Sequence, residues 1–465
     1  MSKENTELKT PNELLKEYLE IYLDGRQSND ELEIKFGNNP KNPITKITFN
    51  TIVEKLKSLG FSCDSVENYL NINSEYVDTR SGRKTISNIR TKISNIHNIK
   101  NYCTDNKLNL EDATSAQYIT FIQKFRKEKR KRDNGEKPEV LYPIDFYDFE
   151  FRVNYKSERD LKINSTHINN LTNNWDDSKK IFRLFKRLTF QHPDYPFKFD
   201  ISIVRSSKKV GKRLLSEYNI KASNVFNNPE TYEVEMEFDN KKAFSCDINK
   251  INSSFRKGVK IMLSAIQNTN YPVSYKEQRL VLQEYHKIVY NGSPPNRGYV
   301  KSSEFIGPSS ISLEIVNTVP IEESNLASNI NQPYTVTEKA DGLRSLLIVS
   351  SIGKIYLLNH NMKIMFTGCI TKNESCWNSI LDGERVELDK NNNYINYFLC
   401  FDIYYINNKS VMEFPFTEME GLVYPKKMPT DIFRYKSLID FTQSFAAEGI
   451  TTKKPPLTIK PKVFY

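Results

Sequence analysis

The stretch Glu31-Leu-Glu-Ile-Lys-Phe36 alternates strictly between charged and apolar residues. Because side chains on a β-strand point alternately to opposite faces, this period of two predicts a strand with one charged and one apolar face. Far along the chain, Tyr232-Glu-Val-Glu-Met-Glu-Phe238 has the same period. The charged faces of these two strands carry Glu31, Glu33 and Lys35 in the first and Glu233, Glu235 and Glu237 in the second.

Four further stretches between them alternate in the same way, so each predicts a strand with one polar face. Their polar faces are richer in basic residues than those of the two glutamate strands. Residues 148–156 align Asp148, Glu150, Arg152, Asn154 and Lys156; residues 197–204 align Lys198, Asp200 and Ser202; residues 182–190 align Arg183, Arg187 and Thr189, with Lys186 as an exception among the apolar residues; residues 86–93 align Asn88, Arg90 and Lys92.

These strands allow two interpretations. An antiparallel sheet with one face in water would show the same alternation, and this explanation is sufficient for any single strand. Aligned carboxylates, however, repel one another unless a cation neutralises them. Glutamates on the first and last strands, with Arg and Lys on the strands between, therefore favour a divalent cation held by carboxylates and a phosphate chain held by basic groups.

A different pattern lies in the C-terminal part of the chain. Lys339-Ala-Asp-Gly-Leu-Arg344 places a lysine beside an expected glycine turn, and Leu381-Asp-Gly-Glu384 places a carboxylate in a second one. A lysine in a pocket among cationic groups can lose its proton near neutral pH and attack a phosphorus atom. An arginine and a carboxylate suit the binding of phosphate, ribose or metal. Apolar stretches at 346–349, 355–358 and 397–401 predict strands around these residues.

The two glutamate strands resemble those of the triphosphate tunnel metalloenzymes, specifically the RNA triphosphatases of fungal and large-DNA-virus capping systems. The resemblance implies an α+β chain that begins with an eight-stranded antiparallel barrel with a hydrophilic interior. Lys198-x-Asp200-x-Ser202 is similar to the basic-x-Asp-x-Thr strand of that family, with lysine and serine as departures. The implied phosphate ligands are Arg90, Lys92, Arg152, Lys156, Arg183, Arg187, Lys198 and Asp200.

The motif at Lys339 resembles motif I of the covalent nucleotidyltransferases, which include mRNA capping guanylyltransferases and polynucleotide ligases. Leu381–Glu384 and Phe401-Asp402-Ile403 resemble motifs III and IIIa, in the expected order. Together the two halves resemble the large subunit of viral mRNA capping enzymes, as in poxviruses, African swine fever virus relatives and mimivirus-like giant viruses. This resemblance covers most of the chain, although outside the motifs it is diffuse.

The resemblance implies a reaction in two steps. The barrel would remove the γ-phosphate of triphosphate RNA, with Mg²⁺ or Mn²⁺ on Glu31, Glu33, Glu235 and Glu237, and with Glu233 orienting the attacking water. Lys339 would then attack GTP to form a lysyl-N-GMP intermediate and transfer GMP to the diphosphate RNA. The GTP contacts implied are Arg344, Glu384 and Asp402.

The chain departs from the nucleotidyltransferase pattern after Asp402. Glu420-Gly-Leu-Val-Tyr424 and Lys460-Pro-Lys462 have the composition of motifs IV and V, but their spacing favours accidental similarity. On that interpretation, residues 457–465 form the strand before the true motif IV, and the guanylyltransferase half is weak or inactive alone. We therefore expect either a fragment of a larger capping enzyme or a partner, such as another capping subunit or a methyltransferase.

We expect three segments: a tunnel domain at 1–245, a helical connector and linker at 246–298, and a nucleotidyltransferase domain at 299–465 that stops before motif IV. A helix is expected at 12–23, and the linker proper at 291–298, where Pro and Gly concentrate. The charged run 124–137 is expected to be a solvated excursion from the barrel, with RNA contact as the alternative.

Composition agrees with an enzyme that acts on nucleic acid, because a net charge of +10 favours a polyanionic partner. The six scattered cysteines favour reduced thiols, and the sequence lacks a membrane-spanning or signal segment. We expect an intracellular, soluble protein, in the host cytoplasm (a viral factory) or the virion if it is viral.

Three alternatives remain open from the sequence. An ATP-dependent RNA or DNA ligase shares the lysine motif, and no residue establishes guanine over adenine. A polyphosphate-handling enzyme would need the barrel without Lys339. A non-catalytic RNA-binding scaffold would be expected to have lost its crowded carboxylates.

Overall fold

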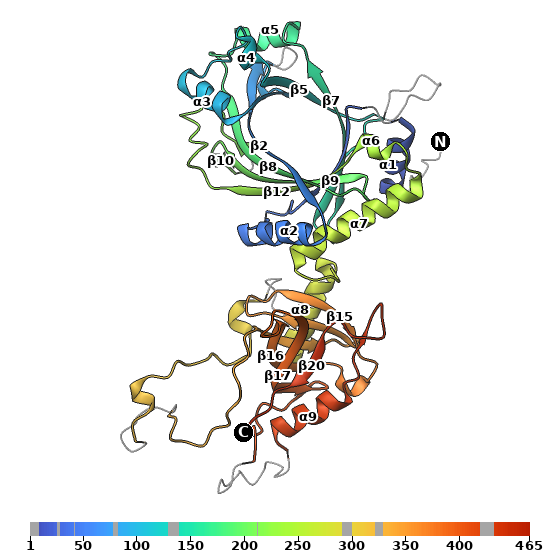
Figure 1. Cartoon of the computed structure of the whole chain (residues 1–465), viewed down its shortest axis with the longest axis vertical. Coiled ribbons are helices and arrows are strands. Elements are labelled where there is room, and N and C mark those ends of the chain that lie inside the picture. The colour runs from blue at the N-terminus through green and yellow to red at the C-terminus, as the bar shows by residue number, and fades with distance from the viewer. Residues whose placement is uncertain are drawn as a thin grey trace, which may run out of the picture. The chain divides into compact units, whose positions relative to one another are not determined.

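A computed structural model of the chain describes residues 9–25, 28–40, 42–77, 82–128, 139–211, 213–290, 300–320, 329–418 and 432–465. It divides into two compact units, residues 1–266 and 267–465 (Figure 1). Both units combine sheets with helices, so the expected α+β class is confirmed. Within these ranges, no helix combines the length and apolar character needed to cross a membrane.

Eight strands of the first unit form a closed antiparallel barrel, which Figure 1 shows end-on. Closure follows from the pairing, because β1 pairs with β12 on one side and with β7 on the other. The expected eight-stranded barrel is therefore confirmed. Around the barrel, the strands are β1 (Asp30–Phe36), β12 (Thr231–Phe238), β9 (Phe197–Ser206), β8 (Lys180–Gln191), β2 (Ser62–Val77), β4 (Ile89–Ser94), β5 (Ile119–Arg126) and β7 (Phe151–Leu161).

The hydrophobic core of this unit lies outside the barrel, between its wall and the surrounding helices. The outer faces of β1, β9 and β12 pack under α1 (Pro11–Gly25), α2 (Lys46–Ser58) and α7 (Ile248–Gln267). On the other side, β2, β4, β5 and β8 pack under α3 (Ile96–Asp105) and α5 (Thr166–Asn173). Because the apolar residues of each strand face outward, the polar residues between them face the interior.

Short elements complete the first unit. Strand β3 (Lys84–Ile86) pairs with β2, and β6 (Ile144–Phe146) pairs with β7. Strand β10 (Lys209–Val210) pairs with β11 (Arg213–Leu214). Helices α4 (Ala113–Ala116) and α6 (Asn240–Ala243) have one turn each.

Two expected segments differ from the structure. The strand expected from Asp148 begins only at Phe151, because residues 147–150 form a turn in which Glu150 has φ +53°. The charged run expected to leave the barrel at Lys124 instead starts inside it, since Lys124 and Arg126 belong to β5. Its remainder at 129–137 lies outside the described residues, as does the expected linker at 291–298.

The expected connector at 246–298 is not a separate body. Its first helix, α7, packs against the barrel, while its second, α8 (Tyr275–Tyr290), packs in the second unit. The physical reason is that both helices carry apolar residues that need a partner, and each covers the sheet of its own unit. The helix expected at 12–23 is confirmed as α1.

The second unit is built on an antiparallel sheet that is buried on both faces. Alternate residues of β13 (Leu343–Val349) pack on opposite sides, so its apolar run is continuous. Helix α8 covers one face and α9 (Arg434–Ser444) the other. The remaining strands are β14 (Lys354–Leu358), β15 (Ile364–Ile370), β16 (Ser379–Leu388), β17 (Tyr394–Ile406), β18 (Lys409–Ser410), β19 (Glu448–Gly449) and β20 (Thr458–Pro461), the last of which pairs with β17 in parallel.

Candidate functional site

The strand register places the polar residues expected at the barrel site on the inner face of the wall. Glu33 pairs with Glu237, Glu235 with Asp200, and Glu237 with Lys198. Directly paired residues share a face, and so do residues two apart on a strand. The inner face therefore carries Glu31, Glu33, Arg90, Lys92, Arg152, Lys156, Arg183, Arg187, Lys198, Asp200, Glu233, Glu235 and Glu237.

The carboxylates at the centre of this face are bound by lysines. Lys35 Nζ lies 2.5 Å from Glu235 Oε1 and 3.5 Å from Glu33 Oε2. Lys156 Nζ lies 2.5 Å from the second oxygen of Glu33. Lys124 Nζ lies 2.8 Å from Glu31 Oε2 and also contacts Glu158. The interior is thus a dense network of alternating charges.

Arg187 joins the carboxylates of two strands. Its guanidinium lies 3.2 Å from Asp200 Oδ2 and 3.4 Å from Glu235 Oε2. Thr189 Oγ1 donates to the other oxygen of Asp200 at 2.7 Å. At the end of the same strand, Arg183 contacts Glu233, whose side chain is 35% exposed. Arg187 is thus held in a geometry that binds two oxyanions at once, whereas Arg183 binds one.

The protonation of two neighbouring glutamates differs because their surroundings differ. Burial disfavours the charged form of Glu235, but the charges of Lys35 and Arg187 prevail and lower its pKa to about 2. Burial raises the pKa of Glu237 to about 7, and the charges of Glu31 and Asp200 add to this effect against the opposing charge of Lys198. Burial and the neighbouring carboxylates thus favour the neutral form of Glu237 more than Lys198 favours its charged form.

Arg152 differs from the expected phosphate ligands. Its guanidinium forms a bidentate pair with Asp145 of β6, with Nε 2.7 Å from Oδ1 and Nη2 2.8 Å from Oδ2. The side-chain hydrogen bond to Asp145 raises the pKa of Arg152. In this structure Arg152 thus ties β6 to β7, although it lies on the inner face of its strand.

The sequence analysis missed two interior lysines that the pairing reveals. Lys35 was on the predicted charged face of the first strand, but its contacts with two glutamates required the neighbouring strand. Lys124 was assigned to a solvated run because its own segment shows no clean alternation. The available signal for Lys124 was the apolar Ile119 and Phe121, which share the opposite face of β5.

The donor chemistry of this interior fits Mg²⁺ or Mn²⁺, because both ions prefer carboxylate oxygens. Within the described residues, however, no group of three or more Asp, Glu, His or Cys side chains has the geometry to hold a metal ion. The ammonium group of Lys35 lies between two of the expected ligands instead. A metal ion would therefore require lysine side chains to move aside, and the raised pKa of Glu237 shows where added positive charge would be stabilising.

In the second unit, Lys339 is accessible rather than enclosed. Its side chain is 84% exposed, and Nζ lies 2.7 Å from Asp341 Oδ1. The hydrogen bond and charge of Asp341 raise the pKa of Lys339, which is the opposite of the lowered pKa that the sequence suggested for a nucleophile. Among the residues that the structure describes, the expected pocket of cationic groups does not surround Lys339.

Arg344 and Glu384 are direct neighbours, paired across β13 and β16. Arg344 binds Asp382, with Nε 3.1 Å from Oδ1 and Nη2 2.6 Å from Oδ2, and Tyr404 Oη donates to the same carboxylate at 2.7 Å. Asp382, which is fully buried, was missed as a partner of Arg344. Glu384 Oε2 is buried without a hydrogen-bond partner in the described part of the chain, so this oxygen is available to a ligand.

Gly342 and Gly383, the glycines of the two motifs, lie so close to a neighbouring strand that no side chain would fit between. A Cβ on Gly342 would lie 2.6 Å from the carbonyl oxygen of Arg385, and one on Gly383 2.6 Å from that of Leu399. The second glycine turn expected from the sequence is therefore wrong: Leu381–Glu384 lies within β16. A larger side chain would separate the paired strands.

Asp402 lines a cavity of about 420 Å³ whose wall also includes Thr337, Arg434 and Lys462. Arg434 holds Asp402 with two contacts, at 2.9 and 3.1 Å. The segment before Lys339 pairs with the last residues of the chain, since Val336 and Tyr465 exchange both backbone hydrogen bonds. Lys462 thereby lies near the lysine motif, although its spacing had suggested an accidental similarity. The similar stretch 420–424 lies outside the described residues.

Part of the chain matches a family of known proteins. Residues 298–453 match the family described as mRNA capping enzyme, catalytic domain. The chain is 23% identical over 395 residues to a probable mRNA-capping enzyme of Acanthamoeba polyphaga mimivirus. This match covers 80% of the present chain. The match spans only 30% of the length of that relative. The resemblance to viral capping enzymes expected from the motifs is confirmed.

Two solved structures are similar to part of this chain. The RNA triphosphatase domain of a trifunctional mimivirus mRNA capping enzyme is 19% identical, with a TM-score of 0.34, and the match covers 55% of this chain and 97% of that domain. The S. pombe RNA triphosphatase Pct1 is 13% identical, with a TM-score of 0.29, and the match covers 56% of this chain and 94% of that protein.

Proposed function

We propose that this chain catalyses two steps of mRNA 5′ capping: removal of the γ-phosphate from triphosphate RNA, and transfer of GMP from GTP to the resulting diphosphate end. The observation that carries the proposal is the joint occurrence of a closed barrel with an inner face of paired carboxylates and arginines and, in the same chain, a capping-domain match that includes Lys339.

In the barrel, the basic inner face would bind the triphosphate, and Arg183 and Arg187 would stabilise the charge that builds up on the γ-phosphate oxygens. Lys92, Lys156 and Lys198, with Arg90, would hold the remaining phosphates, while Asp200 keeps Arg187 in place. Arg152 would contribute only if its pair with Asp145 opened. Exchange of lysine–glutamate pairs for lysine–phosphate pairs would free the glutamate oxygens for a metal ion.

Hydrolysis needs a water molecule in line with the bond between the γ-phosphorus and the β-phosphate oxygen. Glu233 is partly exposed and lies beside Arg183, so it would orient this water and accept its proton. Glu31, Glu33, Glu235 and Glu237 would hold a Mg²⁺ or Mn²⁺ ion, which supplies positive charge to the phosphate oxygens. The new bond joins the water oxygen to phosphorus, and the diphosphate RNA end leaves.

In the second unit, the Lys339 amine would attack the α-phosphorus of GTP, forming a P–N bond and releasing pyrophosphate. The 5′-diphosphate of the RNA would then take the GMP and free the lysine. Glu384 has an unpartnered carboxylate oxygen for a ribose hydroxyl or a metal ion. Arg344 and Asp402 would contact GTP only after exchanging their present partners, Asp382 and Arg434.

The deciding experiment is phosphate release from RNA with a γ-labelled 5′-triphosphate, in Mg²⁺ or Mn²⁺. We expect metal-dependent release by the wild type and its loss in Glu33→Ala and Glu235→Ala. The matched control is Glu54→Ala, an exposed glutamate on α2. Wild-type protein that is folded but releases no phosphate would overturn the first half of the proposal. The expected capping subunit or methyltransferase partner stays a prediction.

A further inference from the structure

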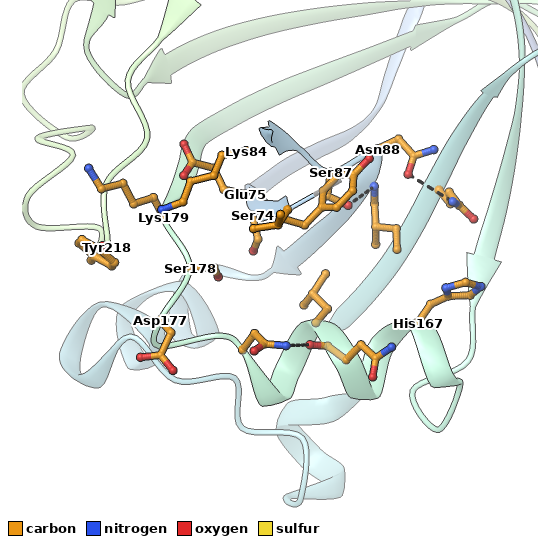
Figure 2. Close-up of a pocket in the computed structure, with 17 residues that line it drawn as sticks. Ser74, Glu75, Lys84, Ser87, Asn88, His167, Asp177, Ser178, Lys179 and Tyr218 are labelled. Atoms are coloured by element: carbon orange, nitrogen blue, oxygen red, sulfur yellow. Dashed lines mark hydrogen bonds between the residues drawn. The ribbon is translucent and has the colours of Figure 1, made fainter. Parts of the chain in front are cut away.

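A cavity outside the barrel wall is not used by the reactions proposed above. It has a volume of about 720 Å³ and lies between α5 and the ends of β2 and β4 (Figure 2). This volume is within the range of small-molecule and cofactor sites. The cavity is larger than needed for a metal ion or a single phosphate, so its shape favours a bulkier ligand.

The lining is rich in groups that donate and accept hydrogen bonds without carrying charge. Amide side chains come from Asn88, Gln123 and Asn174, and hydroxyl groups from Ser74 and Ser87. Ser74 is only 5% exposed, and its buried Oγ has no hydrogen-bond partner in the described ranges. A buried hydroxyl without a partner is costly, so a ligand that supplies one would be stabilised. Amides and hydroxyls suit the edges of nucleobases and ribose.

Aromatic rings and lysines also line the cavity. Tyr76 and Tyr218 are 51% and 50% exposed, so a large part of each side chain is accessible to solvent. Lys179 Nζ lies 5.3 Å from the centre of the Tyr218 ring, and Lys84 is part of the same lining. Exposed aromatic rings beside basic side chains are the usual platform for single-stranded RNA bases and their phosphates. The acidic members, Glu75 and Asp177, disfavour a second polyphosphate site here.

The cavity lies at the end of the barrel where β4 and β8 begin. Asn88 is two residues before Arg90 on the same segment, which corresponds to about 7 Å along a strand. Lys179 likewise immediately precedes β8, which carries Arg183 on its inner face. The strands that bring two of the expected phosphate ligands into the barrel thus begin at the cavity wall.

We propose that this cavity binds the first nucleosides of triphosphate RNA while the triphosphate itself lies inside the barrel. The inference rests on the proposed function and adds the basis of substrate choice. A triphosphate held at Arg90 would leave its attached nucleoside at the rim, where Tyr218 and the amides can contact it. Inorganic triphosphate lacks these nucleosides and gains nothing from the cavity.

The test compares two substrates in wild-type protein and Tyr218→Ala. The first is a triphosphate RNA decamer with a fluorophore at its 3′ end, and the second is inorganic triphosphate. We expect the KM for the RNA to rise about tenfold, as for loss of one stacked base, while hydrolysis of inorganic triphosphate is unchanged. Tyr394→Ala, which removes a tyrosine that is 65% exposed in the second unit, is the matched control.

A binding measurement without divalent metal separates this inference from the proposed function. Fluorescence anisotropy should show that Tyr218→Ala and Asn174→Leu weaken binding of the decamer about tenfold, and that a decamer with an abasic first position loses the same amount. Equal affinity in wild type and both variants would overturn the inference. RNA binding that depends on Tyr218, in a protein that releases no phosphate, would support the cavity and overturn the triphosphatase proposal.

Discussion

Glu33 on β1 lies directly opposite Glu237 on β12, inside the barrel. Two like charges at this spacing destabilise a sheet, and lysines compensate only part of the cost. Within the described ranges, Glu33 has two lysine partners, Lys35 and Lys156, whereas Glu237 has one, Lys198 at 3.4 Å. The pair therefore concentrates negative charge at a point where a bound cation would be stabilising.

The first prediction concerns stability and pH. The pKa of Glu237 is raised from 4.5 to about 7, mainly by burial, so the folded protein keeps a proton that the unfolded chain releases. Stability should therefore fall as pH rises from about 4.5 to 7 and stay lower above that range. Glu237→Gln should be more stable than wild type at pH 8 by on the order of 1–3 kcal/mol, and similar to it at pH 4.5.

Urea unfolding of the first unit at several pH values measures this difference. Glu54→Gln, on the exposed face of α2, is the control and should leave the pH dependence unchanged. An identical pH profile for wild type and Glu237→Gln would contradict the prediction. Added Mn²⁺ should reduce the pH dependence of the wild type only, because a cation stabilises the charged form of Glu237.

A second prediction concerns Lys35, whose ammonium group lies between Glu33 and Glu235. Lys35→Met removes this competing charge and should tighten Mn²⁺ binding roughly tenfold, the size expected from one neighbouring charge. Lys35→Arg retains the charge and should not tighten it. Isothermal titration at pH 8 measures both affinities, and weaker Mn²⁺ binding by Lys35→Met would show that Lys35 supports the metal site.

A third prediction is that phosphate release requires an arginine at position 187 and that a lysine there is not sufficient. It contacts Asp200 and Glu235 through different nitrogens, and a lysine cannot reproduce this geometry. We expect Arg187→Lys to lower the rate of phosphate release about 100-fold, comparable to loss of one donor to a developing oxyanion. Circular dichroism checks the fold, and Arg213→Lys, an exposed residue of β11, is the control. Near-normal release by Arg187→Lys would place Arg187 outside the phosphate site.

The fourth prediction concerns Lys339. Because Asp341 raises its pKa, the amine is protonated at neutral pH, and labelling with GTP should be weak at pH 7 and increase towards pH 9.5. Lys339→Ala should abolish labelling and change stability by less than about 0.5 kcal/mol, because the side chain is 84% exposed.

Radiolabelling with α-labelled GTP and ATP, followed by denaturing electrophoresis, makes this measurement. Lys354→Ala is a control within the same unit, since Lys354 pairs with Glu277 on α8. Strong labelling at pH 7 would show that this half is active in the chain as it stands, against our expectation. Labelling by ATP but not GTP would favour a ligase.

The barrel was predictable from sequence because each strand has one face packed under helices and one face in the polar interior, and its residues alternate accordingly. Residues such as Ile34 and Val234 had to be apolar to pack under helices, and Glu33 and Glu235 had to be polar to face the interior. Residues two apart share a face whatever the rest of the chain does. The alternation therefore identified six of the eight barrel strands and most of the residues on their inner face, whereas β2 and β5, whose alternation is less regular, were not predicted.

The lysine motif was predictable only in part. Sequence order identified Lys339, Arg344, Glu384 and Asp402, but not how these side chains are held. Arg344 is bound by Asp382, and Asp402 by Arg434. Arg434 lies 32 residues after Asp402 along the chain. Such contacts depend on strand pairing and on α9, and no local pattern reports them.

By itself, the sequence determined which residues share a polar face in six of the barrel strands and which motifs are present, since these follow from local periodicity and order. Only the tertiary structure decided that β1 meets both β12 and β7, that Lys35 lies between two glutamates, and that Lys339 is exposed beside Asp341. Those facts depend on pairing between residues distant in sequence, and pairing sets the charge around each group. Charge and burial, in turn, determine whether a glutamate holds a proton or a lysine can lose one.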